Sequence, residues 1–234
     1  MSTGSRKSRR KKAKGLTVRN TIHPELRLFD ESFRAQGVSV LAGVDEAGRG
    51  PLAGSVFAAA VVLPAELELP YLNDSKKLSE SRRESLFDEI RASAIAYGIG
   101  EATVEEIETL NILQAAMLAM QRAVAAMTDA NGLAVHPELV LVDGNRAPSL
   151  NVPTQCVIGG DAKSASIAAA SVLAKVTRDR SMRTLAEQYP MYGFAQHKGY
   201  GTAMHYQAIE QFGPSPVHRL SFLKKYNARK QREE

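Results

Sequence analysis

Val44-Asp45-Glu46-Ala47-Gly48-Arg49-Gly50-Pro51 lies between two apolar runs, Val38 to Val44 and Ser55 to Leu63. This order predicts a strand, a tight connection and a second strand. Neighbouring side chains in a strand point to opposite faces, so Asp45 and Glu46 can serve one site only where the strand ends or distorts. Carboxylates crowded at a strand end repel one another, and a divalent cation relieves that repulsion.

The small residues after the two acids suit a ligand that approaches the main chain. Gly48 and Gly50 leave their backbone N–H groups uncovered, and Arg49 between them adds a charge suited to phosphate. The pattern is neither a dinucleotide fingerprint, because acids occupy the phosphate loop, nor a P-loop, because Gly-Lys-Ser/Thr is absent. A solvated acidic turn would have the same local sequence, so further acids in similar settings must decide.

Two such acids follow. Leu139-Val140-Leu141-Val142 is an apolar run typical of a strand buried on both faces, and it ends in Asp143-Gly144-Asn145. A short strand over Thr154 to Ile158 precedes Asp161, which stands just before a long helix from Ser164 to about Gln188. Functional groups gather where strands of an α/β sheet end, although a turn-forming Asp143 and a helix-stabilising Asp161 would also explain these positions.

Gly43-Val44-Asp45-Glu46-Ala47-Gly48-Arg49-Gly50-Pro51-Leu52-Ala53-Gly54 resembles the signature of the ribonuclease HII family, and later segments match that family in order and spacing over residues 38 to 223. The resemblance implies an α/β fold of the ribonuclease H type: a central mixed five-stranded sheet flanked by helices, with a small helical C-terminal part. It also implies a metal-dependent endonuclease that hydrolyses the RNA strand of RNA–DNA hybrids. Cutting 5′ of single ribonucleotides in duplex DNA, with 3′-hydroxyl and 5′-phosphate ends, is expected with it.

The resemblance assigns roles to particular residues. The catalytic and metal-binding acids would be Asp45, Glu46, Asp143 and Asp161, holding two Mg²⁺ or Mn²⁺ ions. The substrate-binding residues would be Gly48, Arg49, Gly50, Ser75, Lys76, Lys77, Lys198 and Tyr200. Among these, the amides of the Gly48–Gly50 segment would bond the 2′-hydroxyl, the Ser75–Lys77 segment would follow the backbone, and Tyr200 would stack on the ribose.

The sequence leaves two interpretations open for Asp179, His218 and Arg219. Asp179 lies between arginines, so an ion pair competes with catalysis, whereas His197 reads as structural. His218 and Arg219 either fix the C-terminal tail or touch nucleic acid. Cys156, beside Val157 and Ile158, is expected to be a small buried hydrophobe.

Other helices are expected over Pro24 to Gln36, Asn111 to Met127 and Thr202 to Phe212, and a strand over Ser93 to Thr103. A further helix begins at Ser79 or Ser81. In domain terms, residues 1–37 are expected to form a basic, disordered arm and a lead-in, 38–190 the ribonuclease H-like catalytic core, and 191–234 a C-terminal loop and helices with a basic tail.

The charge distribution points to a polyanionic partner. The first 14 residues hold seven of the 30 basic side chains and no acid, which leaves 23 basic against 25 acidic residues elsewhere. A basic arm of this kind suits nucleic acid, and its recruitment of a sliding clamp is left open. The single cysteine excludes an intrachain disulfide, and the absence of a signal peptide or a long apolar run predicts a cytoplasmic protein without a membrane partner. A monomer is assumed; a catalytically silent nucleic-acid-binding protein on the same fold is the alternative.

Overall fold

The computed structural model describes residues 23–67 and 69–224, and the basic arm over residues 1–14 lies outside them. A five-stranded mixed sheet forms the centre, with the strand order β3-β2-β1-β4-β5. The strands are β1 (Leu41–Ala47), β2 (Val56–Val62), β3 (Ala96–Ala102), β4 (Leu139–Asp143) and β5 (Thr154–Val157). β1, β2 and β3 pair antiparallel, whereas β4 runs parallel to both β1 and β5. The central mixed five-stranded sheet expected from the sequence is confirmed.

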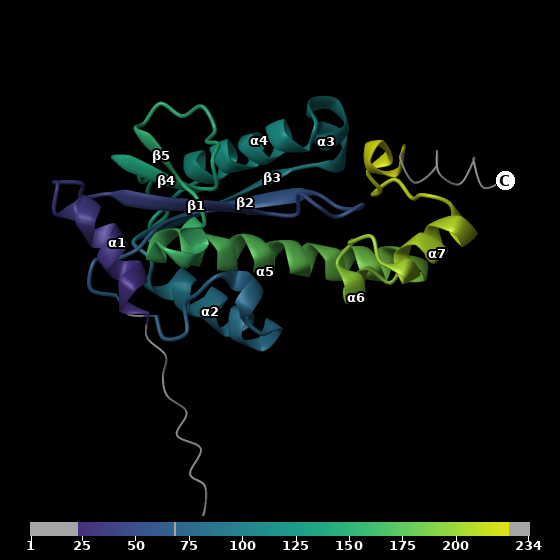
Figure 1. Cartoon of the computed structure of the whole chain (residues 1–234), viewed down its shortest axis with the longest axis horizontal. Coiled ribbons are helices and arrows are strands. Elements are labelled where there is room, and N and C mark those ends of the chain that lie inside the picture. Colours follow the sequence, from purple (N-terminus) through teal and green to yellow (C-terminus); the bar gives the residue numbers. More distant parts are fainter. Residues whose placement is uncertain (1–22, 68, 225–234) are drawn as a thin grey trace, which may run out of the picture.

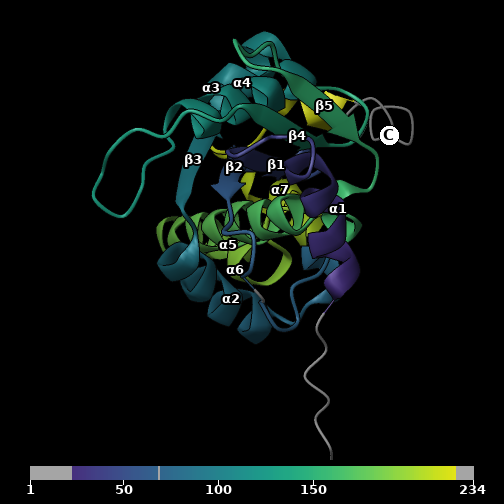
Figure 2. The same ribbon diagram turned by 90° about the vertical axis from the view of Figure 1, so that its left-hand side faces the viewer.

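Helices cover both faces of this sheet (Figures 1 and 2). The helices are α1 (Pro24–Arg34), α2 (Glu80–Ser93), α3 (Val104–Leu110), α4 (Ile112–Ala125), α5 (Ala165–Gln188), α6 (Phe194–His197) and α7 (Ala203–Phe212). α4 lies on one face and the long α5 on the other, α6 packs beside the C-terminal part of α5, and α7 lies near that end of the molecule (Figure 1). α2 begins after Ser79, whose hydroxyl accepts from the Arg82 amide, which decides between the two predicted starts.

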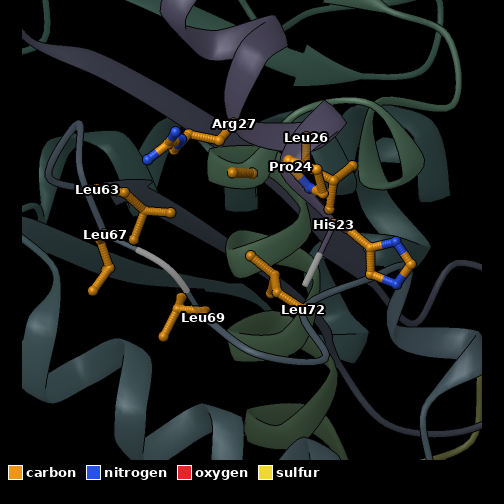
Figure 3. Close-up of a pocket in the computed structure, with 9 residues that line it drawn as sticks. His23, Pro24, Leu26, Arg27, Leu63, Leu67, Leu69 and Leu72 are labelled. Carbon is orange, nitrogen blue, oxygen red and sulfur yellow. The ribbon is translucent and has the colours of Figure 1, made fainter. Parts of the chain in front are cut away.

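α1 packs beside the N-terminal end of α5. The buried carboxylate of Asp30 accepts hydrogen bonds from the Ser166 amide at 2.9 Å and the Ser166 hydroxyl at 2.7 Å. Apolar side chains of α1 and of the segment 63–72 surround a pocket of about 30 Å³ (Figure 3). None of the predicted catalytic acids lines it, so this pocket is separate from the acidic site.

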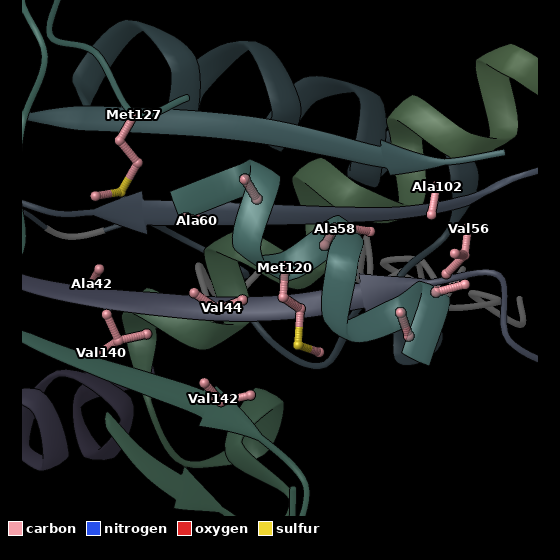
Figure 4. Packing of buried hydrophobic residues seen from close by; sticks show 14 of the residues in the cluster. Ala42, Val44, Val56, Ala58, Ala60, Ala102, Met120, Met127, Val140 and Val142 are labelled. Atoms are coloured by element: carbon pink, nitrogen blue, oxygen red, sulfur yellow. The ribbon is translucent and has the colours of Figure 1, made fainter. Parts of the chain in front are cut away.

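Close approach of helices to the sheet follows from small residues on both sides. A Cβ added to Gly43 would lie 2.2 Å from the Ser166 carbonyl carbon on α5, and one on Gly100 would lie 2.1 Å from the Ala119 oxygen on α4. On the α4 face, Val44 and Val142 pack with Met120 and Met127 in the main core cluster (Figure 4). The helices are therefore held near the strand ends that carry the acids.

One expectation of burial is wrong. Cys156 is exposed, not a buried hydrophobe. Its strand, β5, lies at the edge of the sheet, and Ile158 just beyond it is 70% exposed. An edge strand has fewer neighbours to cover its faces, so local apolar sequence does not guarantee burial.

Within the described residues, no helix has both the length and the apolar character that spanning a bilayer requires.

Candidate active site

Three carboxylates from separate parts of the chain come together at one edge of the sheet. Asp45 lies on β1, Asp143 ends β4, and Asp161 lies in the turn Gly160–Ala162 that precedes α5. One oxygen of each lies within 4.8 Å of the others. Because β1 and β4 are parallel neighbours, their carboxyl ends meet at the same edge, as the sequence predicted.

These acids carry an unfavourable charge without a cation. Burial raises the pKa of Asp45 well above its usual range, and the charges of Glu46 and Asp143 raise it further. Burial and Asp143 also raise the pKa of Asp161, whereas Lys76, with its Nζ 3.3 Å from Asp161 Oδ2, acts in the opposite direction. Carboxylate oxygens are the donors that hard divalent cations prefer, so this cluster fits such a cation.

Glu46 is placed differently from the other acids. The strand continues past its apolar run through both acids to Ala47. Asp45 and Glu46 both line a cavity with Ser171 and Lys175 of α5, and the alternation of β1 also brings Glu46 to a groove against α4. Glu46 Oε1 lies 3.2 Å from Arg49 Nη1, and Glu46 is not in the group of three close carboxylates. The structure thus brings Asp45, Asp143 and Asp161 together and leaves Glu46 beside them.

Two buried arginines hold the Gly48–Gly50 segment and the residues after it. The guanidinium of Arg219 donates to five carbonyl oxygens, those of Gly48, Arg49, Pro51, Gly54 and Ser55, at 2.7 to 3.3 Å. Sequence reasoning left this arginine undecided between the tail and nucleic acid; its contacts are with the loop.

Arg178 adds a second support to the loop, which sequence reasoning missed. It donates to the carbonyls of Ala53 and Lys198 at 3.3 and 3.0 Å, and its Nε lies 2.4 Å from the position of a Cβ on Gly48. Neither arginine has a local sequence signal, because their acceptors in this loop lie 125 to 171 residues away in the chain.

Tyr200 lies beside the same segment from the far end of the chain. Its Cε1 would be 3.6 Å from a Cβ on Gly50, and its side chain is 45% exposed. Tyr200, the Gly48–Gly50 segment, Asp45 and Asp143 line one cavity of about 220 Å³. The predicted sugar-facing residues and three of the predicted metal ligands, since Glu46 also lines this cavity, thus share a single open space.

The remaining predicted binding residues vary in their distance from this cavity. Ser75 and Lys76 line it, whereas Lys77 is exposed and does not. Lys198 Nζ donates to the Ala195 carbonyl of its own loop at 2.6 Å and is not a lining residue. The geometry thus brings Ser75 and Lys76 to the acids but not Lys77 or Lys198.

Asp179, left open between an ion pair and catalysis, and His197, expected to be structural, both have partners within the protein. Asp179 is buried and pairs with Lys175 Nζ at 2.6 Å, one helical turn away. His197 binds backbone groups of its own loop through both ring nitrogens, at the Tyr192 carbonyl and the Gly199 amide. Both arrangements are those of structural contacts.

Comparison with known proteins agrees with this geometry. The family model described as Ribonuclease HII matches residues 42–225. The chain belongs to the ribonuclease HII family. A ribonuclease HII of Dechloromonas aromatica (strain RCB) is 59% identical over 185 residues, which cover 79% of this chain and 91% of that protein. One of Paracidovorax citrulli (strain AAC00-1) is 60% identical over 183 residues, 78% of this chain and 74% of that protein.

Solved structures of ribonucleases H2 and HII share the fold. The ribonuclease H2 of Pyrococcus horikoshii OT3 has a TM-score of 0.61 and 25% identity, covering 77% of this chain and 92% of that one. The ribonuclease HII in a PCNA complex from Archaeoglobus fulgidus has a TM-score of 0.62 and 23% identity, covering 77% and 94%. As a member of this family, the chain is a metal-dependent endonuclease of the ribonuclease H type, the class that acts on RNA–DNA hybrids.

Proposed function

We propose that this protein hydrolyses phosphodiester bonds in the RNA strand of RNA–DNA hybrids and cuts 5′ of single ribonucleotides in duplex DNA. The products carry 3′-hydroxyl and 5′-phosphate ends. One observation carries the proposal: Asp45 and Asp143 line the same cavity as the Gly48–Gly50 segment and Tyr200. A phosphate bound at the acids would therefore have its sugar next to groups suited to a 2′-hydroxyl.

The acids are the residues that would hold the metal. Asp45, Asp143 and Asp161 fit one cation by their proximity, and Glu46, at the same strand end, completes the set of four proposed for two Mg²⁺ or Mn²⁺ ions. Such ions supply an activated water and stabilise the leaving oxygen. Lys76 lies against Asp161 and stabilises its ionised form. We infer that Lys76 keeps Asp161 available as a ligand.

Discrimination between RNA and DNA is assigned to the loop. Arg219 and Arg178 hold the carbonyls of the 48–55 segment, which fixes the directions of the amides in the same peptides. Those amides are proposed to bond the 2′-hydroxyl, and Tyr200 to stack on the ribose. Because the arginines come from α5 and from the C-terminal segment, the proposed catalytic core over residues 38–190 depends on residues 191–234 for this function.

Backbone contacts complete the proposal. Ser75, Lys76 and Lys77 are proposed to follow the phosphates on one side, and Arg49 and Lys198 to contribute charge around the loop. Arg49 and Lys77 are exposed, so their cationic groups are accessible to a polyanion.

The test is cleavage of three labelled duplexes in Mg²⁺ or Mn²⁺: all-DNA, an RNA–DNA hybrid, and DNA with one ribonucleotide. We expect cleavage of the last two only, loss of cleavage in Asp143→Asn, and weakened cleavage at the single ribonucleotide in Tyr200→Ala. Cutting of all three duplexes would keep the acidic site but reject the 2′-hydroxyl sensor, and would indicate a general structure-specific nuclease. Binding without cleavage in both metals would favour the silent-binder alternative.

We also propose a protein partner and an oligomeric state. The Archaeoglobus fulgidus ribonuclease HII was solved with PCNA, and a sliding clamp is a candidate partner for this chain as well. Size-exclusion chromatography alone and with a bacterial clamp would test both clamp binding and the assumed monomer. The cytoplasmic location expected from the sequence stays a prediction.

A further inference from the structure

Three histidines lie behind the loop that carries Tyr200, and the proposed reaction uses none of them. His197 ends α6, His205 lies in the first turns of α7, and His218 follows α7; we call them the histidine cluster. The rings of His197 and His205 stack with centroids 4.4 Å apart, and His205 Nε2 lies 3.0 Å from His218 Nε2. His205 and His218 are buried, at 0% and 2% exposure. Their hydrogen bonds are therefore made with protein rather than with water.

The direction of these hydrogen bonds can be derived from one backbone amide. His218 Nδ1 lies 2.9 Å from the Ser215 amide nitrogen, whose N–H can only donate. Nδ1 therefore carries no proton, and a neutral His218 must carry its proton on Nε2. That proton points at His205 Nε2, which has to accept it.

The same logic passes to the next ring. With Nε2 accepting, a neutral His205 carries its proton on Nδ1, which lies 2.9 Å from the carbonyl oxygen of Tyr200. The four groups thus form a chain in one direction: the Ser215 amide donates to His218, His218 to His205, and His205 to the Tyr200 carbonyl. A proton added to either ring would place two N–H groups face to face and break the chain.

The surroundings of the rings favour this neutral state. Burial lowers the pKa of His218 to about 4, with His205 acting in the same direction, and burial lowers the pKa of His205 as well. The titratable neighbours are His197, stacked on His205, and Tyr192, whose ring centroid lies 4.7 Å from that of His218. The chain of hydrogen bonds is therefore intact at neutral pH.

The chain of hydrogen bonds through His218 and His205 is also connected to the Gly48–Gly50 segment, which faces Tyr200 across the cavity. His218 is followed directly by Arg219, which holds the carbonyls of Gly48 and Pro51, and His218 forms a β-bridge with Ala53. The pair His218–Arg219 thus contacts the carbonyl of Gly48 directly and the backbone of Tyr200 through His205. A purely structural role in closing the C-terminal part would not require these two contacts to converge on one cavity.

We propose that His205 and His218 are positioning residues that set ribonucleotide recognition by holding the backbone of Tyr200 against the Gly48–Gly50 segment. This inference rests on the proposed role of Tyr200 in the function above. It predicts that loss of either histidine impairs cleavage at a single ribonucleotide more than cleavage of a long hybrid. At a single ribonucleotide one particular sugar must be recognised, whereas a long hybrid offers many.

The test is a double-mutant cycle with His205→Ala and Tyr200→Ala, read as kcat/KM on the single-ribonucleotide duplex and on the long hybrid. We expect His205→Ala to lower kcat/KM on the single-ribonucleotide duplex about tenfold, equivalent to about one net hydrogen bond. In the Tyr200→Ala background it should have no further effect, because it acts through Tyr200. His136→Ala, an exposed histidine, is the matched control and should cleave normally.

Each outcome decides between the two proposals. Multiplicative losses in the double variant, or equal losses on both substrates, would overturn the positioning role. If the Tyr200→Ala variant cut the single-ribonucleotide duplex normally, the proposed role of Tyr200 would be wrong, and the positioning role of the histidines would be rejected with it. If Tyr200→Ala lowered cleavage but His205→Ala did not, only the positioning role would be wrong. Nitrogen-15 NMR of the histidines in the wild-type protein needs no variant and so does not depend on whether the variants fold. We expect protons on His205 Nδ1 and His218 Nε2, and the opposite tautomers would refute the proposed direction of the hydrogen bonds.

Discussion

Replacing Arg219 with methionine tests the support of the Gly48–Gly50 segment most directly. Methionine keeps an unbranched apolar stem but removes all five N–H donors, which bond five carbonyl oxygens. The three short bonds, at 2.7 to 2.8 Å, go to Gly48, Pro51 and Gly54, which are buried residues. Their carbonyls would be left without a donor and without ready access to water.

The magnitude follows from these three acceptors. A buried polar group without its partner costs about 1–3 kcal/mol, so three give roughly 3–9 kcal/mol. Removal of the charge offsets part of this loss, because burial disfavours the guanidinium and lowers its pKa to about 9. We expect a net loss of about 3 kcal/mol in the free energy of unfolding, and lysine at this position, with up to three donors, should fall between wild type and methionine.

Urea denaturation followed by circular dichroism measures this loss, and hybrid cleavage measures its effect on the loop. Arg34→Met is the matched control: that arginine makes one bond to the Leu63 carbonyl at 3.0 Å, so its loss should stay below about 1 kcal/mol. If Arg219→Met were no less stable than Arg34→Met, the loop would not depend on Arg219 and the reasoning would be refuted. Wild-type kcat/KM in Arg219→Met would reject its link to activity.

Three further outcomes follow from other contacts. Gly43→Ala should lower the free energy of unfolding by at least about 2 kcal/mol, because its Cβ would meet α5 backbone at 2.2 Å; a loss below about 0.5 kcal/mol in urea would contradict this. Stability should fall by about 1–2 kcal/mol between pH 7 and pH 5, because burial holds the pKa of His218 at about 4 and the unfolded chain, near 6.5, binds the proton first. His218→Gln should flatten that dependence, and an unchanged slope would argue against a neutral buried ring. Saturating Mg²⁺ or Mn²⁺ should raise the unfolding temperature of the wild type by several degrees but not that of Asp143→Asn. Without metal, Asp143→Asn should be the more stable protein, because one of the crowded charges is gone. Equal metal-induced shifts of the two proteins in a thermal-shift assay would show that Asp143 is not a metal ligand.

The sequence alone determined most of the elements and the identity of the main acids. Apolar runs marked β1, β2 and β4, and the strands β3 and β5 and the long helix α5 were also expected near their observed positions. Side-chain caps at Ser79 and Thr202 set helix starts near the predicted positions, whereas α3, capped by Thr103 and Glu106, was not predicted. These features depend on residues within a few positions of one another, so local sequence contains them.

The signature around Asp45 and its later counterparts then selected the family, and with it the ribonuclease H-like fold. Composition and periodicity would not have distinguished this fold from other mixed sheets covered by helices. The resemblance also located Asp143 and Asp161 as members of one site, which the parallel pairing of β1 and β4 explains physically.

Tertiary structure decided how the side chains around that site are used. It paired Glu46 with Arg49 and left it outside the group of three close carboxylates, although it lines the same cavity as Asp45. It assigned Arg219 to five carbonyls of a distant loop, joined His205 to His218, and left Cys156 exposed on an edge strand. Each of these depends on groups far apart in the chain or on the position of a strand in the sheet. Such contacts exist only once the chain has folded, since the free energy that selects them comes from the whole packed structure and not from any one stretch of it.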